Sequence, residues 1–227
     1  MTAPVSGADA KQCSLHLLDA ARRTQHCFLE AGDCCRYLWE YRPGLPRNRA
    51  QRWISDLKCR PSQAAARPLR AIYKECALLR AAQALRAAAP RAWVEQASWC
   101  PIPPSARAGA SDYDDRLLRL LRLAFAGYDV DIRPLLRQSQ SLPADHCGRQ
   151  RVAFAALYEA MTVDTSQLLS CTLRMEVVLF DDVLTTGKHL KCAQLRLRER
   201  LGPLSISACV LARRVLVAKR RGVVGAS

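Results

Sequence analysis

The chain has 227 residues, of which 50% are hydrophobic, a size and composition that favour one well-buried globular domain with a small N-terminal extension. No apolar run approaches the roughly 18 residues of a membrane span, and the chain does not open on a basic start followed by an apolar core. We therefore expect neither a membrane anchor nor a secretory signal, and a cytoplasmic location. The eleven cysteines are odd in number and scattered, which predicts mostly reduced thiols.

The formal net charge is +15 and the isoelectric point is near 9.8, and most of the cations are arginines. Guanidinium groups bind phosphates in a bidentate manner, so this charge is compatible with nucleic acid or with a polyanionic metabolite. A GC-rich coding bias, which places arginine wherever a solvated cation suffices, explains the same composition. Charge alone leaves both interpretations open.

Helical spacing of apolar residues predicts an N-terminal helical region over residues 1–95. Its helices are expected at residues 9–27, 50–57 and 68–89, with a Pro/Gly break at residues 42–46. In the third helix, the residues expected to face inward are Leu69, Ile72, Tyr73, Cys76 and Leu79. Together these helices would form a cap.

The rest of the chain alternates strand and helix patterns, which predicts a parallel α/β sheet over residues 96–212. The strands are expected at residues 97–102, 130–136, 174–180 and 205–212. The helices are expected at residues 112–124, 152–161 and 189–200. A basic tail at residues 213–227 lacks periodicity and is expected to be frayed.

The most informative segment is 177–187, Val-Val-Leu-Phe-Asp-Asp-Val-Leu-Thr-Thr-Gly. Four consecutive apolar residues predict a strand buried on both faces, followed by the acids Asp181 and Asp182 at its carboxyl end, where open α/β sheets bind ligands. Thr185, Thr186 and Gly187 then offer hydroxyl and N–H donors just before a helix, a combination suited to phosphate. The carboxylates suit ribose hydroxyls, and the segment as a whole predicts a sugar phosphate.

Two other interpretations of this segment are weaker. The acids can be simple turn formers and helix N-caps, but adjacent acids followed by Thr-Thr-Gly are a narrower pattern than that requires. A P-loop would need glycine at Asp182 and serine or threonine at His189, so the spacing excludes it.

Residues 181–187, preceded by the apolar strand, resemble the PRPP-binding motif of type I phosphoribosyltransferases, especially their ComF-like branch. The resemblance covers roughly residues 97–212. It implies a type I phosphoribosyltransferase fold, a parallel sheet flanked by helices with an N-terminal helical cap, and transfer of phosphoribosyl between PRPP and a nitrogenous base, with Mg²⁺ and release of pyrophosphate. The first hundred residues match only loosely, and the base is not revealed.

The resemblance also implies roles for individual residues. Asp181 and Asp182 would hold the ribose hydroxyls, with Asp182 nearer to the developing positive charge. The residues implied for the 5-phosphate are Thr185, Thr186, Gly187, Lys188 and His189. The family usually has a small residue and then threonine or serine after the glycine. Lys188 can add a cation there, but His189 removes a hydroxyl donor, which favours binding over turnover.

Two weaker segments match the family in place. Ser105, Ala106 and Arg107 follow an early strand and precede a helix, where the family binds pyrophosphate; a rigid proline-rich turn is the alternative. Arg137, His146, Arg149 and Arg151 fall where the family has a flexible loop that closes over PRPP, and they suit a departing pyrophosphate. A solvated charged loop is the alternative.

The N-terminal cysteines Cys27, Cys34 and Cys35 raise the question of zinc, because many ComF-like proteins carry an N-terminal Cys-x-x-Cys ribbon. This chain lacks that spacing, so we expect thiols and no structural zinc.

A rival function is a non-catalytic regulator that binds PRPP or a nucleotide, or a competence-type DNA-uptake factor. The sequence leaves the oligomeric state open.

Overall fold

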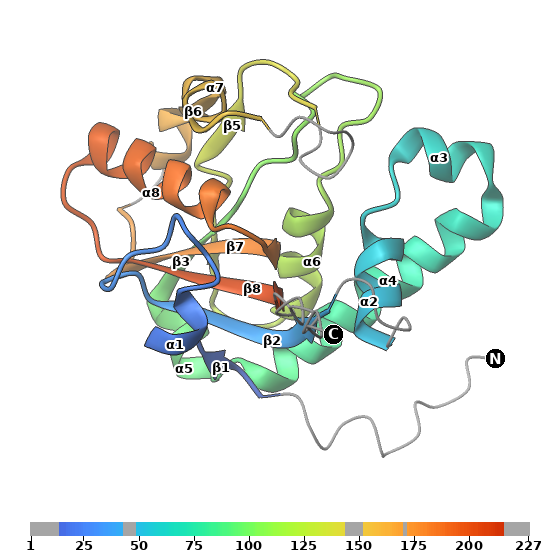
Figure 1. The fold of residues 1–227 in the computed structure, drawn as a ribbon, viewed down its shortest axis with the longest axis horizontal. Helices are drawn as coiled ribbons and strands as arrows, with labels where there is room; N and C mark the ends of the chain where they lie inside the picture. Colours follow the sequence, from blue (N-terminus) through green and yellow to red (C-terminus); the bar gives the residue numbers. More distant parts are fainter. Residues whose placement is uncertain (1–13, 43–48, 144–151, 170–171, 216–227) are drawn as a thin grey trace, which may run out of the picture.

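A computed structural model describes residues 14–42, 49–143, 152–169 and 172–215 of the chain (Figure 1). Its main sheet has six strands in the order β1-β2-β8-β7-β3-β4, all parallel except β1. These strands are β1 (His16–Leu17), β2 (Cys35–Tyr41), β3 (Ala97–Pro101), β4 (Asp131–Ile132), β7 (Glu176–Leu184) and β8 (Ile206–Arg214). The expected class, an α/β fold with a mostly parallel sheet flanked by helices, is confirmed.

A second sheet pairs two short antiparallel strands, β5 (Leu136–Gln138) and β6 (Met161–Val163). The helices are α1 (Ala20–Arg23), α2 (Arg49–Leu57), α3 (Pro61–Ala66), α4 (Pro68–Ala88), α5 (Arg91–Gln96), α6 (Arg116–Ala124), α7 (Phe154–Ala160) and α8 (Lys188–Leu201), with a 3₁₀ turn at Thr165–Leu168. Within these described segments, no helix is long and apolar enough to cross a membrane.

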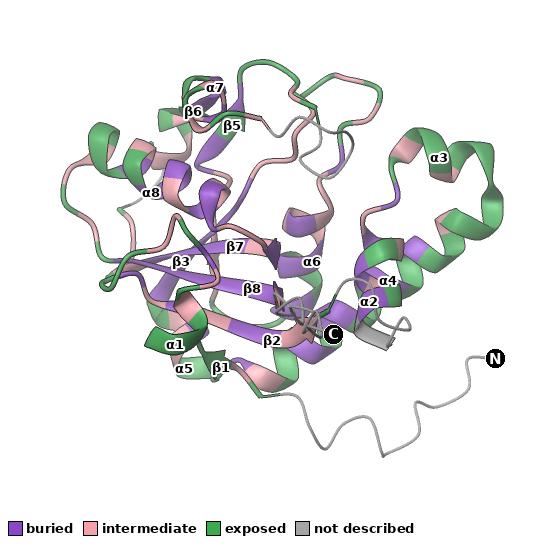
Figure 2. Cartoon of the chain, in the orientation of Figure 1, coloured by how far each residue is buried: buried purple, intermediate pink, exposed green. Residues whose placement is uncertain are grey.

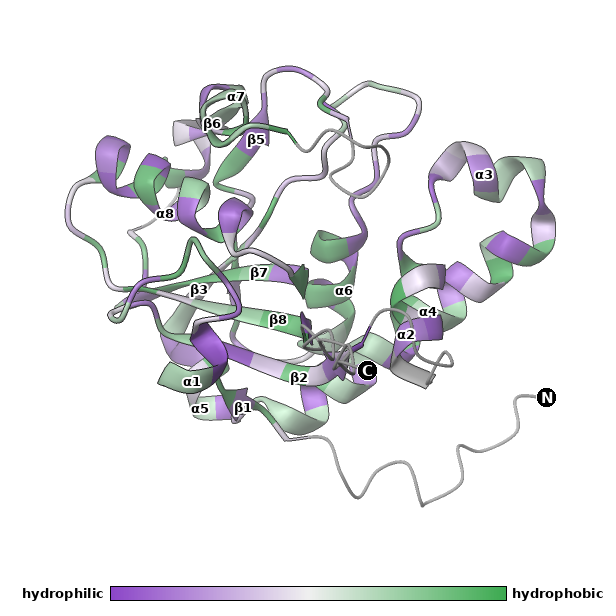
Figure 3. Cartoon of the chain, viewed as in Figure 1, coloured by the Kyte–Doolittle hydropathy of each residue, from purple (hydrophilic) through white to green (hydrophobic). Residues whose placement is uncertain are grey.

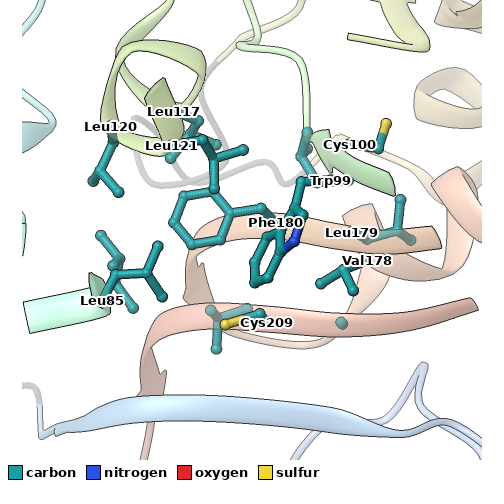
Figure 4. Packing of buried hydrophobic residues seen from close by; sticks show 14 of the residues in the cluster. Leu85, Trp99, Cys100, Leu117, Leu120, Leu121, Val178, Leu179, Phe180 and Cys209 are labelled. Atoms are coloured by element: carbon teal, nitrogen blue, oxygen red, sulfur yellow. The ribbon is translucent and has the colours of Figure 1, made fainter. Parts of the chain in front are cut away.

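The core lies around the central strands β3, β7 and β8. Residues 177–180 of β7 are fully buried, as the continuous apolar run predicts for a strand covered on both faces. On one face of the sheet, the ring centroid of Trp99 lies 4.9 Å from that of Phe125 and 6.3 Å from that of Phe180. Figure 4 shows Trp99 and Phe180 close together, with leucines of α6 above them. This rigid centre fixes the strand from which the candidate site projects.

The order of the strands creates a topological switch point between β3 and β7. From β3 the chain crosses through α6 to β4 on one side, and from β7 it crosses through α8 to β8 on the other. Right-handed crossovers in opposite directions place α6 and α8 on opposite faces of the sheet. The carboxyl ends of β3 and β7 therefore flank the crevice in which open α/β sheets bind ligands.

The predicted helix at residues 9–27 is wrong. Among the described residues this region holds the two-residue strand β1 and the four-residue helix α1, and the strand β2 that follows was not predicted. β2 pairs in parallel with β8, with Tyr37 opposite Val210, so its partner lies at the far end of the chain. Local periodicity carries no information about such a partner. The sheet consequently draws strands from both sides of the predicted boundary between residues 95 and 96.

The predicted strand at residues 130–136 is also wrong as a single element. Arg133 still donates its N–H to the Trp99 carbonyl at 2.9 Å, but Pro134 has no N–H, and the chain leaves the main sheet there to form β5. Other predicted elements are confirmed within a few residues, including β3, β8, α2, α4 and α8. β7 runs further than predicted, through the acid pair to Leu184, and β8 runs to Arg214, inside the predicted tail.

Helix α4 presents the opposite face to the one predicted. Leu69, Ile72, Tyr73 and Leu79 are between 49% and 65% exposed, and Cys76 is also exposed, as the outer part of α4 in Figures 2 and 3 shows. The buried residues are Lys74, Ala77, Leu78, Ala81, Ala82, Ala84 and Leu85. The helix has two apolar sides. The alanine-rich side is the buried one, because its small side chains let the helix pack closer to the core than the side with Leu69, Ile72 and Tyr73 would.

Candidate functional site

The acids Asp181 and Asp182 lie in the last part of β7, just beyond the end of β3. The last β3 pair joins Pro101 to Phe180, and the N–H of Ile102 donates to the Phe180 carbonyl at 2.8 Å before the chain departs. Because successive side chains of a strand point to opposite faces, the two carboxylates face different surroundings. Strand β7 thus places two carboxylates with different surroundings at the switch point.

Asp182 is buried, with 3% of its surface exposed, and is held by two cations. The Lys58 ammonium lies 3.0 Å from Oδ1, and the Arg116 guanidinium donates to Oδ2 from Nη2 at 2.7 Å and from Nε at 3.2 Å. Burial by itself would raise the pKa of Asp182, but the charges of Lys58 and Arg116 and their hydrogen bonds hold it well below its usual range. Asp182 is an ionised carboxylate at neutral pH.

The ion pairs continue from Asp182 toward helices α2 and α4. Arg116 also donates to Asp114 at 2.9 Å, and Asp114 accepts from the Lys74 ammonium at 2.7 Å. Lys74 is on α4, and Lys58 directly follows α2. The network therefore joins these two helices to the start of α6 and to β7. The carboxylate of Asp182 connects them by binding both Lys58 and Arg116. Neither Lys58 nor Arg116 was expected in the site, since no local pattern connects them to residue 182.

Asp181 lines a small, open recess with the residues that follow it. The other residues of the recess are Val183, Leu184, Thr185, Gly187, Lys188, His189 and Leu190. One oxygen of Asp181 accepts the N–H of Asp182 at 2.8 Å. Burial, followed by the negative charge of Asp182, raises the pKa of Asp181 to about 7. The recess thus contains an acid that changes its charge near neutral pH.

The loop at residues 185–187 forms the turn into α8. Gly187 is the N-cap residue and has a φ of 83°, in the left-handed region that favours glycine. The N–H of Lys188 donates to the Thr186 hydroxyl at 3.4 Å. The first N–H groups of a helix have no carbonyl partner within the helix, and they carry the positive end of its dipole. The recess therefore combines hydroxyls, amides and a helix N-terminus in the way a phosphate requires.

The carbonyls of this loop are engaged by residues 26–33, which join α1 to β2. The His26 ring bonds through Nδ1 to the Thr185 carbonyl, and the Phe28 N–H donates to the Thr186 carbonyl at 3.0 Å. Residue 26 was expected to lie in a helix, with no role in the site. Asp33 and Glu30 also reach α8, through the Lys191 ammonium.

Lys188 differs from its predicted role as a cation facing the phosphate. It is buried, and its ammonium donates to the Val152 carbonyl at 2.5 Å, just before α7. His189 does line the recess, together with Thr185 and Gly187. Four of the five residues predicted for the phosphate therefore line the recess, and the fifth, Thr186, caps the helix beside it.

The residues predicted for pyrophosphate lie at the same edge of the sheet but do not line the recess. The carbonyl of Ser105 accepts the N–H of Leu142 at 2.8 Å, and the N–H of Arg107 donates to the Ser141 hydroxyl at 3.1 Å. Ala106, between them, is half-buried. The loop after β3 is thus tied to residues 141–142.

Of the predicted lid residues, only Arg137 lies in the described part of the chain. It is on β5, its side chain is 60% exposed, and it forms an ion pair with Asp164. His146, Arg149 and Arg151 lie outside the described residues. The lid therefore stays a prediction.

No group of three or more His, Cys, Asp or Glu side chains is arranged to hold a metal ion in the described segments. Cys27 is exposed, Cys35 is buried, and burial raises the pKa of the Cys35 thiol. The acid pair does not fit Mg²⁺ as a direct ligand set, because both oxygens of Asp182 already bind cations.

Comparisons of the chain with protein-family models, with curated proteins and with solved structures found no match.

Proposed function

We propose that this chain binds PRPP or a nucleoside 5-monophosphate in the recess at residues 181–190, and transfers phosphoribosyl between PRPP and a nitrogenous base. The observation that carries the proposal is the recess itself, which brings Asp181 together with Thr185 and Gly187 at the start of α8. This recess follows the strand next to the switch point of a mostly parallel sheet. The sequence resemblance to type I phosphoribosyltransferases points to the same residues.

The phosphate end of the ligand would bind at the start of α8. Thr185 supplies a hydroxyl, and the amides around Gly187 supply N–H groups, with the helix dipole favouring the negative charge. Lys188 is bonded to the Val152 carbonyl, so the phosphate is held mainly by backbone amides and hydroxyls. This arrangement binds an anion without requiring a free ammonium in the recess.

The ribose end would lie against Asp181. A carboxyl whose pKa is near neutral can accept a hydrogen bond when ionised, or donate one when protonated, and ribose hydroxyls offer both partners. Asp182 is engaged by Lys58 and Arg116, so its part is to hold Asp181 and these cations in place. The proposal assigns sugar contact to Asp181 and support to Asp182.

In the transfer, the C1–O bond of PRPP breaks and its electron pair leaves on pyrophosphate. A ring nitrogen of the base forms the new bond to C1 and gives up its proton to solvent. Mg²⁺, bound by the pyrophosphate, would supply charge neutralisation on the leaving group. Lys58, whose side chain is 26% exposed, adds positive charge beside the acid pair, and Asp181 when ionised stabilises the oxocarbenium-like C1.

A second candidate function is a non-catalytic regulator that keeps the pocket without the reaction. It is favoured by one observation: both oxygens of Asp182 are bonded to cations of the protein, which leaves one acid of the pair for the sugar. His189 stands where the family has a hydroxyl residue, and this also favours the regulator.

Isothermal titration calorimetry with PRPP, with and without Mg²⁺, and with AMP tests the proposal. We expect binding by the wild type, weakened about tenfold in Asp181→Asn by loss of a charge-assisted hydrogen bond. Asp129→Asn is the matched control, because this acid is 87% exposed and precedes β4 at the opposite edge of the sheet. If the wild type binds neither PRPP nor AMP, the proposal is refuted.

Pyrophosphate release in the presence of Mg-PRPP and a panel of purine and pyrimidine bases then separates the two functions. Release with any base supports the transferase. Tight binding without release from any base supports the regulator.

A further inference from the structure

The loop that joins α1 to β2, residues 26–33, contacts each residue of the turn at 185–187. His26 bonds to the Thr185 carbonyl, and Phe28 donates its N–H to the Thr186 carbonyl at 3.0 Å. A Cβ added at Gly187 would lie 2.7 Å from Cγ of Leu29, so the two segments are in direct contact there. Figure 1 shows this loop reaching from α1 toward α8. A segment remote in sequence thus sets the shape of the turn.

The His26 ring is fully buried, and its protonation state follows from its surroundings. A carbonyl oxygen only accepts, so Nδ1 must carry the proton that bonds to Thr185. The other ring nitrogen, Nε2, is buried and has no hydrogen-bond partner among the described residues. Burial lowers the pKa of His26, which keeps the ring neutral. The single proton of the neutral ring is therefore donated to the Thr185 carbonyl.

The two carbonyl contacts also determine where the amides of the turn point. In a trans peptide the C=O and the N–H of the same unit point in opposite directions, and the described residues contain no cis bond. Fixing the carbonyls of Thr185 and Thr186 toward the 26–33 loop therefore turns the N–H groups of Thr186 and Gly187 away from it. These contacts restrict the rotation of both peptide units.

The first turn of α8 is held by the same loop. The Lys191 ammonium lies 2.8 Å from Glu30 and 3.3 Å from Asp33, and Asp33 also accepts the Glu30 N–H at 2.7 Å. The 26–33 loop thus contacts both the turn at 185–187 and Lys191 in the first turn of α8.

We infer that His26 is a positioning residue for the phosphate loop: by holding the Thr185 carbonyl, it fixes the shape of the turn whose residues Thr185 and Gly187 line the recess. This inference rests on the proposed function and deepens it, since it assigns to the N-terminal segment the task of preorganising the phosphate loop. Preorganised amides bind an anion without having to be ordered at the moment of binding.

Two substitutions at this position separate positioning from packing. His26→Leu keeps a buried side chain of similar size without the donor, and His26→Asn keeps an N–H donor near Nδ1. His16→Leu is the control, because His16 is exposed on β1. Affinity is measured by calorimetry with Mg-PRPP and with AMP. Hydrogen exchange of peptides covering residues 185–190 is measured without ligand.

We expect His26→Leu to weaken both ligands about tenfold and to accelerate exchange in residues 185–190. His26→Asn should restore both properties, and His16→Leu should change neither. Wild-type affinity in His26→Leu, or unchanged exchange, would overturn the inference. If the wild type binds neither ligand while the exchange pattern is as expected, the proposed function fails but His26 still holds the loop.

Discussion

Asp181 and Asp182 are adjacent on one strand, yet their carboxyl groups are held in opposite states. Lys58 and Arg116 keep the pKa of Asp182 far below its usual range, whereas burial and the charge of Asp182 raise that of Asp181 to about 7. The cations keep Asp182 charged, and that charge raises the pKa of Asp181, while the direct effect of Lys58 and Arg116 on Asp181 lowers its pKa and offsets part of the rise. Pairs of acids with divergent pKa values are typical of functional sites.

Asp182→Asn should destabilise the protein, because it leaves Arg116 and Lys58 without their carboxylate. Loss of one partner from a buried ion pair costs about 3 to 5 kcal/mol, and the remaining contact of Arg116 with Asp114 favours the lower end. Urea denaturation of the wild type and the variant measures the difference. Asp129→Asn is the exposed control, and equal free energies of unfolding for Asp182→Asn and wild type would show that the network contributes no stability.

Asp181 should make stability fall as the pH rises toward neutral. Its folded pKa of about 7 is above the ordinary 3.8, so between these values the folded state retains a proton that the unfolded state has released. Asp182 behaves in the opposite sense: its depressed pKa gives stability above pH 3.8 that is lost only in stronger acid.

Asp181→Asn should therefore become more stable relative to the wild type as the pH rises from about 5 to about 8. Thermal melts across this range, with Asp129→Asn alongside, measure the difference. Parallel curves for wild type and Asp181→Asn would contradict the raised pKa.

Gly187→Ala should disrupt the phosphate loop for two reasons. The left-handed φ of 83° is unfavourable for alanine, at a cost of about 1 to 2 kcal/mol, and the new Cβ meets Leu29. Gly127→Ala is the matched control, since Gly127 has a φ of 81° but open space around it.

We expect Gly187→Ala to lose more stability and affinity for Mg-PRPP than Gly127→Ala, and Leu29→Ala to recover part of both in the double variant. Thermal melts and calorimetry test this. Equal effects of the two glycine substitutions would mean that the contact with Leu29 does not matter.

Nucleic-acid binding should be weak despite the net charge of +15. Many of the described arginines are bonded to acids or carbonyls, among them Arg116, Arg133 and Arg174. A filter-binding titration with single- and double-stranded DNA across salt concentrations tests this, because a role in nucleic-acid binding would give clear binding at low salt that falls steeply as salt rises. Saturating Mg-PRPP should not compete with it. Submicromolar affinity at physiological salt would instead favour the regulator or DNA-uptake function.

Much of the central sheet could be predicted from local patterns. The apolar run at 177–180 predicted a fully buried strand, and the adjacent acids followed by Thr-Thr-Gly predicted the turn into α8, because both features depend on neighbours in sequence. The strands β3 and β8 and the helices α2 and α4 followed from the same periodicities. These elements are specified by short-range sterics and by which residues must be buried.

The tertiary structure decided what distant partners do to the same residues. Pairing with β8 made a strand of residues 35–41, and Pro134 divided a predicted strand because the sheet required an N–H there. The outward face of α4 was chosen by close packing of alanines, which a helix with two apolar sides cannot specify alone. Lys58, Arg116 and His26 reach residues 182 and 185 only because the fold brings them there. Charge and hydrogen-bond energy depend on distance in space, so the sequence determined the position of the acids and the loop, while the tertiary structure determined which acid is free and which way the loop faces.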